Sequence, residues 1–206
     1  HDPLKSALQN ALVNATQQKQ WGQAESTLYA YSHLLSIQDL LAQRQSLSKA
    51  EVQAGYVPAD MQSRLQQVQQ HRDAITKLVS SAKYDSDWDA QLLGTFQETI
   101  ALLQPNDMSW FETMRDNIAH AYIKLAEQMA QQDRFDAADS LLENGQLYAP
   151  ELTDFGQAKQ TIAQAQNSFQ QQQAERQRLA QVTNLENTFQ LQTKAGKMSD
   201  ADKTYA

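Results

Sequence analysis

The chain has 206 residues and a formal net charge of −7, and it contains six Gly, four Pro and no Cys. Without cysteine, disulfides, thiolate nucleophiles and cysteine-based zinc sites are excluded within this sequence. Lys and Arg are dispersed along an acidic chain, which argues against nucleic acid and anionic membrane surfaces as partners. The scarcity of Gly and Pro, together with abundant Ala, Leu, Gln, Glu and Lys, predicts an all-α protein.

The first expected unit covers residues 3–57. Apolar residues at helical spacing predict one helix over residues 3–18 and a second that starts near Trp21. No Gly or Pro interrupts the chain before Gly55, so we expect this second helix to continue to about Ala54, straight or with a bend near Ser36.

Two further units are expected at residues 58–104 and 105–150. The first begins with a long helix and, after a polar break, continues with a helix that we predict to be capped by Ser86 and Asp89. The other is expected to open with a long helix over about residues 109–132, capped by Ser109 and Glu112. Each unit therefore contains two helices.

The segment 118–150 carries the clearest pattern in the chain. Two apolar stripes at helical spacing flank the polar break at residues 131–133, and Pro150 ends the second stripe. The stripe residues are Tyr122, Leu125, Ala126 and Met129, then Phe135, Ala138, Leu142 and Gly145. This pattern resembles a tetratricopeptide-type helical hairpin, in which large, small and aromatic residues recur at similar offsets.

The same offsets recur at Leu8, Leu12, Trp21, Ala24 and Leu28. Pro58, Pro105 and Pro150 lie 47 and 45 residues apart, longer than the roughly 34 residues of a standard tetratricopeptide unit. The resemblance thus implies a degenerate repeat with long helices. It predicts an elongated array of antiparallel helical hairpins, a tetratricopeptide-like α-solenoid, in a single region over residues 1–206.

The last unit, residues 151–206, is expected to consist mainly of one long helix over about residues 154–194. Apolar residues are interrupted at residues 170–173, so we predict a partly exposed helix that packs at both ends rather than a coiled coil, with Gly196 as its stop. The hairpin offsets return at Leu185, Phe189, Met198, Ala201 and Tyr205. This pattern suggests a truncated fourth hairpin and hence a piece of a longer protein.

Two patterns resemble sites of known chemistry. His71-Arg72-Asp73 matches a kinase catalytic-loop triplet, but no Gly-rich loop accompanies it. The alternating Asp85, Asp87 and Asp89 resemble the start of a calcium loop, without its central Gly and terminal Glu. Helix capping explains these carboxylates better. We therefore predict no catalytic residues, no metal site and no cofactor.

In tetratricopeptide-like arrays, peptides lie on the concave face formed by the first helices of successive hairpins. Carried over by position, the resemblance implies a partner-binding face of eight residues, with Ile123 as its outward-facing apolar member. These residues are Asp73, Thr76, Ser80, Tyr84, His120, Ile123, Glu127 and Gln131. The alternative interpretation is that they form ordinary solvated helix faces.

The resulting functional hypothesis is a non-enzymatic protein–protein interaction or scaffold module of bacterial type, which binds a peptide, a partner domain or other parts of its own full-length chain. The alternative is an extracytoplasmic regulatory or structural segment of a larger anchored signalling or envelope enzyme, with the chemistry elsewhere. Composition favours a periplasmic location only weakly. An enzyme within these residues is the third, least favoured hypothesis.

Overall fold

A computed structural model describes residues 3–194, and this range is helical without any strand. The all-α prediction is confirmed. The helices are α1 (Pro3–Gln17), α2 (Trp21–Ala30), η1 (Ser32–Leu34), α3 (Ile37–Ala54), α4 (Met61–Ser80), α5 (Ser86–Leu102), η2 (Pro105–Asp107), α6 (Met108–Gln131), α7 (Phe135–Gln146) and α8 (Asp154–Lys194).

The predicted continuous helix from Trp21 to Ala54 is wrong. The chain forms a 3-10 turn after α2, and α3 starts anew with Ser36 as its N-cap. The Ser36 hydroxyl accepts a hydrogen bond from the backbone N–H of Asp39 at 3.1 Å and donates one to the Asp39 carboxylate at 2.7 Å. This cap satisfies helix donors that would otherwise be unpaired, which favours a new start over a bend.

The two predicted capping boxes are also wrong. Helix α5 is capped by Asp85, whose carboxylate accepts from the backbone N–H of Asp87 at 2.9 Å. The capping box before α6 joins Gln104 and Asp107 around η2, so Ser109 lies inside α6. In both cases a residue upstream of the expected serine caps the chain, and the helix begins earlier.

The connections α1–α2 and α6–α7 have the same backbone geometry. Lys19 and Asp133 adopt φ values of 57° and 60°. The N–H of Gln20 donates to the carbonyl of Ala15 at 2.8 Å, and the N–H of Arg134 donates to that of Met129 at 2.9 Å. A residue in the left-handed conformation, followed by a hydrogen bond that reaches back five residues, is a common way for a helix to end before a tight turn.

One contiguous core joins the helices from α1 to α8. Helix α5 packs against α2, α3 and α4, and α6 packs most extensively against α7. Aromatic contacts tie α5 to α6: the Trp88 and Tyr122 rings lie 5.2 Å apart, and Phe96 and Phe111 lie 5.4 Å apart. On α6 and α7, Ala126 and Ala138 are fully buried, and their small side chains allow the two helices to pack closely.

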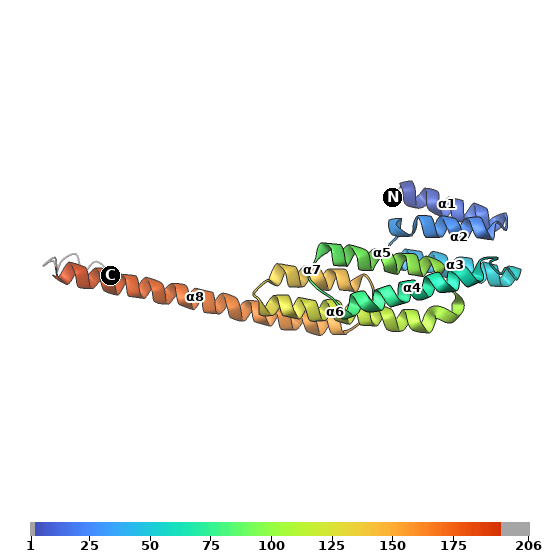
Figure 1. The fold of residues 1–206 in the computed structure, drawn as a ribbon. Coiled ribbons are helices and arrows are strands. Elements are labelled where there is room, and N and C mark those ends of the chain that lie inside the picture. The colour runs from blue at the N-terminus through green and yellow to red at the C-terminus, as the bar shows by residue number, and fades with distance from the viewer. Residues whose placement is uncertain (1–2, 195–206) are drawn as a thin grey trace.

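Helix α8 is a single long helix, as predicted, and it projects away from the other helices (Figure 1). Its first part packs on α6 and α7 through Phe155, Ala158 and Ile162. Farther along α8, Leu179, Val182 and Leu185 are exposed, so the expected packing is not seen at these three positions. The predicted Gly196 stop and the fourth-hairpin positions from Met198 onward lie outside the described residues.

Candidate protein-binding surface

The three α4 members of the predicted face are exposed and engaged with their own helix. Asp73 accepts a hydrogen bond from the Gln69 amide at 2.9 Å. The Thr76 and Ser80 hydroxyls donate to backbone carbonyls of the preceding turn at 2.8 and 2.9 Å. Such contacts leave these groups solvated and locally satisfied.

The α6 members do not form the expected row, and the prediction that Ile123 faces outward is wrong. Its side chain is only 9% exposed and belongs to the core. Helix α6 packs against α4, α7 and α8, and Ile123 lies on the packed part of its circumference. Glu127 and Gln131 are exposed, while the His120 ring lies against Asp154 of α8 at 3.0 Å.

The pKa of His120 is raised, because its Nδ1 faces the carbonyl of Asp116 at 2.7 Å and its Nε2 faces the Asp154 carboxylate. Both partners accept from the doubly protonated ring. This stabilisation is complete below the unfolded-state pKa near 6.5 and is lost as pH rises through the folded-state value. We expect His120→Gln to remove that pH dependence, measured as the difference in urea midpoint between the two proteins from pH 5.5 to 8.5. An unchanged difference across this range would contradict the assignment.

Tyr84 is the predicted residue that borders recessed surface on both sides. A pocket of about 350 Å³ lies between the α4–α5 connection, the start of α5 and α7. A shallower depression of about 390 Å³ adjoins it at the start of α7. The Tyr84 ring is 46% exposed, and the Arg134 guanidinium lies 4.7 Å from its centre, which orients the ring.

The pocket beside Tyr84 is lined mainly by polar residues, and one of them, Asp89, is bound by the buried Tyr122. Asp89 accepts a hydrogen bond from the Tyr122 hydroxyl, and the Asn144 amide lies 3.4 Å from the other oxygen of this carboxylate. Burial raises the pKa of Tyr122, so its hydroxyl stays protonated and donates. At the rim, the Lys83 ammonium and the backbone N–H of Asp87 hold the pKa of Asp85 below its usual range. This arrangement presents a carboxylate and an amide that can recognise a polar ligand.

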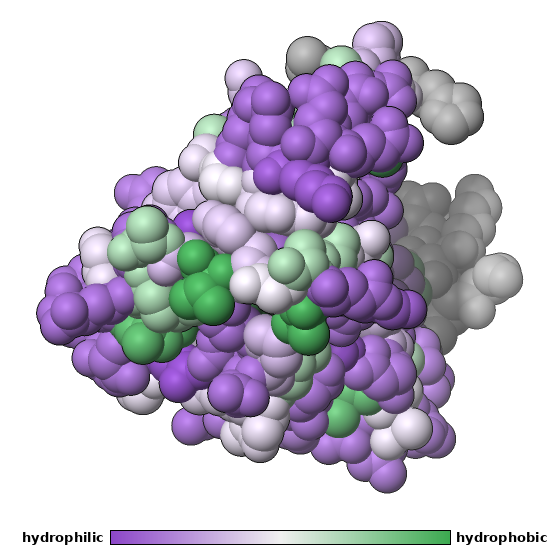
Figure 2. All heavy atoms as spheres, turned by 90° about the vertical axis from the view of Figure 1, so that its right-hand side faces the viewer, coloured by the Kyte–Doolittle hydropathy of each residue, from purple (hydrophilic) through white to green (hydrophobic). Residues whose placement is uncertain are grey.

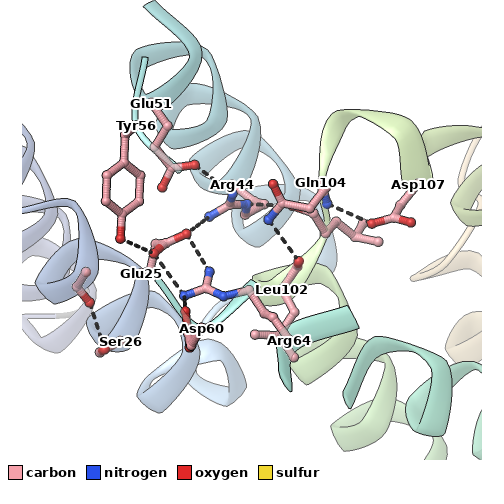
Figure 3. Close-up of polar contacts among 12 residues, drawn as sticks. Glu25, Ser26, Arg44, Glu51, Tyr56, Asp60, Arg64, Leu102, Gln104 and Asp107 are labelled. Carbon is pink, nitrogen blue, oxygen red and sulfur yellow. Dashed lines mark hydrogen bonds and ion pairs between the residues drawn. The ribbon is translucent and has the colours of Figure 1, made fainter. Parts of the chain in front are cut away.

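A second polar cluster is buried between α2, α3 and α4 (Figure 3). Glu25, only 3% exposed, accepts from Arg64 at 3.0 Å and lies 3.7 Å from Arg44. Arg44 in turn donates to Glu51 at 2.8 Å and to the carbonyl of Leu103 at 2.8 Å. Each arginine thus has a carboxylate partner, and the cluster ties four parts of the chain together.

Sequence reasoning missed these four charged residues. Arg44 and Glu51 lie seven residues apart on one helix face, which is the only local signal. Glu25 and Arg64 come from other helices, and the break at Ser36 that brings α3 beside α2 was not predicted. The cluster is enclosed and its charged side chains pair with one another, so we assign it a structural role.

The residues that resemble chemical motifs do not converge. His71 Nε2 faces Glu98 of α5 at 3.6 Å, and the Arg72 guanidinium lies 4.6 Å from the centre of the Trp110 ring, while Asp73 is exposed. Within residues 3–194, no three His, Asp or Glu side chains lie in an arrangement that can hold a metal ion. Within the same range, no helix combines the length and the apolar character needed to cross a membrane.

No protein-family model, curated protein or solved structure matches the chain.

Proposed function

We propose that this chain is a non-enzymatic protein–protein interaction module that binds a peptide across the surface around Tyr84. The observation that carries the proposal is an exposed aromatic side chain between two adjoining recesses. Tyrosine in such a position provides a large contact area at low entropic cost, which is why it is enriched at interfaces.

The charges around Tyr84 suggest the chemistry of the peptide. The two recesses are lined by the carboxylates Asp85, Asp89, Asp133 and Asp136, against the cations Lys83 and Arg134. Lys83 is paired with Asp85 at 2.6 Å, and Arg134 covers the tyrosine ring. The remaining carboxylates favour a peptide that carries a basic side chain near its anchor.

A tetratricopeptide-like arrangement of helical hairpins is part of the proposal. The matching turns at Lys19 and Asp133 support it, as do the packed pairs α1–α2, α4–α5 and α6–α7. The proposed face nevertheless differs from the concave row implied by the resemblance. It retains Tyr84 and replaces the α6 row with the start of α7.

Selection from a phage-displayed random peptide library tests this function. The bait is this chain, beside Tyr84→Ala and a matched control, Tyr31→Ala, whose ring is 49% exposed on another part of the surface. Peptides enriched by the first protein should be rich in Lys or Arg, should bind the control equally, and should lose about tenfold or more in affinity for Tyr84→Ala. Enriched peptides whose affinity is the same for all three proteins, or no enrichment, would overturn the proposal. Replacement of Ile123 is unsuitable for this test because it would disturb the core.

The alternative function, a regulatory or structural segment of a larger protein, has one observation in its favour. Leu179, Val182 and Leu185 are 54, 44 and 47% exposed on the projecting part of α8. Apolar residues in such a row are typical of a helix that packs against another element. Limited proteolysis of this chain alone and of a larger protein that contains it would distinguish the alternatives. If another part of the larger protein covers the projecting part of α8, this segment should be cleaved more slowly there than in the isolated chain.

A further inference from the structure

Another recess, separate from the two beside Tyr84, lies along α3. Its volume is about 430 Å³, and its walls are α3 and the segment that joins α5 to α6. The apolar side chains lining it are Leu41, Val52, Leu103, Pro105 and Met108. We call it the α3 groove.

The groove is elongated along one helix. Leu41, Gln45, Ser48 and Val52 follow at intervals of three or four residues on α3, so they share one face. Eleven residues of helix correspond to about 16 Å, or three turns. Figure 2 faces the end of the molecule where α3 ends and α6 begins, and apolar side chains gather there within a largely hydrophilic surface.

The charges of the α3 groove are opposite to those of the chain as a whole. Its lining includes Arg44 and Lys49 but no carboxylate, in a chain whose formal charge is −7. Arg44 is engaged by Glu51 and the Leu103 carbonyl, whereas Lys49 is exposed. The nearby Asp107 is held by Arg72. Lys49 is therefore the cation available to a ligand in this groove.

We propose that the α3 groove binds an acidic amphipathic helix of a partner protein. Two or three apolar side chains at helical spacing would fill the recess, and a carboxylate on the flank of that helix would pair with Lys49. A three-turn groove with an apolar floor matches helix-in-groove recognition, where anchors recur at positions i, i+4 and i+7. The site is independent of the surface around Tyr84, because the 17 residues of α5 separate them, about 25 Å of helix.

Fluorescence anisotropy with two designed peptides tests this site. Both carry Leu at positions i, i+4 and i+7 of a helical sequence, one with Glu and the other with Lys at the flanking positions. The acidic peptide should bind at least about tenfold more tightly than the basic one. Its affinity should fall about tenfold on Lys49→Glu and on Val52→Asp. Val52 is 67% exposed, so its replacement leaves the fold intact.

The matched control is Val57→Asp, because Val57 is 71% exposed and does not line the groove. It should leave the affinity of the acidic peptide unchanged, as should Tyr84→Ala, which separates this proposal from the proposed function. The proposal would be overturned if both peptides bound equally, or if the affinity of the acidic peptide were unchanged by Lys49→Glu and Val52→Asp. Self-association in sedimentation experiments that Val52→Asp abolishes would also overturn it, because a second copy would then occupy the groove.

Discussion

Glu25→Gln is expected to lower the free energy of unfolding by about 3–5 kcal/mol. The substitution keeps the shape of the side chain but removes the carboxylate that both Arg44 and Arg64 face. Arg44 is 2% exposed and the Arg64 side chain 11%, so water cannot replace the lost charge effectively. Urea denaturation followed by circular dichroism gives the value.

Two controls separate this effect from a general response to lost acidic charge. Glu175→Gln removes an exposed partner of Arg178 and should change stability by less than about 1 kcal/mol. Glu51→Gln should cost less than Glu25→Gln, because burial and then the neighbouring Glu25 raise the pKa of Glu51 and so favour an uncharged side chain there. Equal losses for all three variants would show that the buried cluster has no special role.

Gly145→Ala is the second substitution with a large expected effect, about 2–4 kcal/mol of lost stability. A Cβ atom at this position would lie 2.7 Å from the Cβ of Tyr122 and 3.0 Å from the ring of Phe155. Tyr122 and Phe155 are 0 and 1% exposed, so neither can move aside without displacing other core residues. Thermal unfolding should show a lower midpoint.

Gly94→Ala is the matched control for that substitution. Gly94 also lies inside a helix, but a Cβ atom there would meet nothing within 4 Å. Alanine should therefore stabilise the protein, by about 0.5–1 kcal/mol, through its higher helix propensity. If Gly145→Ala were stabilising as well, the close contact between α6, α7 and α8 at this position would be incorrect.

Helix periodicity was sufficient to predict most of the helices. The predicted helix start near Trp21 and the polar break at residues 131–133 agree with the observed turns, and α8 spans the predicted range. Periodicity failed where a cap decided the outcome. Ser36 starts a new helix inside an apolar pattern that continues without a Gly or Pro, because the pairing of its hydroxyl with Asp39 is a local interaction that the apolar spacing does not reveal.

The surface was harder to predict than the helices. Ile123 was expected to face outward because its position was carried over from the concave face of tetratricopeptide-like arrays, whereas α6 here packs against α4, α7 and α8. Tyr84 was predicted as a binding residue from its position in the repeat. Its neighbours Arg134, just before α7, and Asn144, within α7, are distant in sequence, so the pattern did not indicate them. The α3 groove depends on the unpredicted start of α3, so the sequence offered no signal for it.

Helix α8 projects from the other helices, so a small rotation at its base becomes a larger displacement at its far end. Phe169 of α8 packs against the body of the protein, with its ring 5.7 Å from that of Phe135. From there to Lys194, 25 residues of helix correspond to about 37 Å. A rotation of α7 by about 5° that carries α8 with it would shift the tip by about 3 Å. A partner bound beside Tyr84 would contact the start of α7, where such a rotation would originate. A group near Lys194 would move by the larger distance.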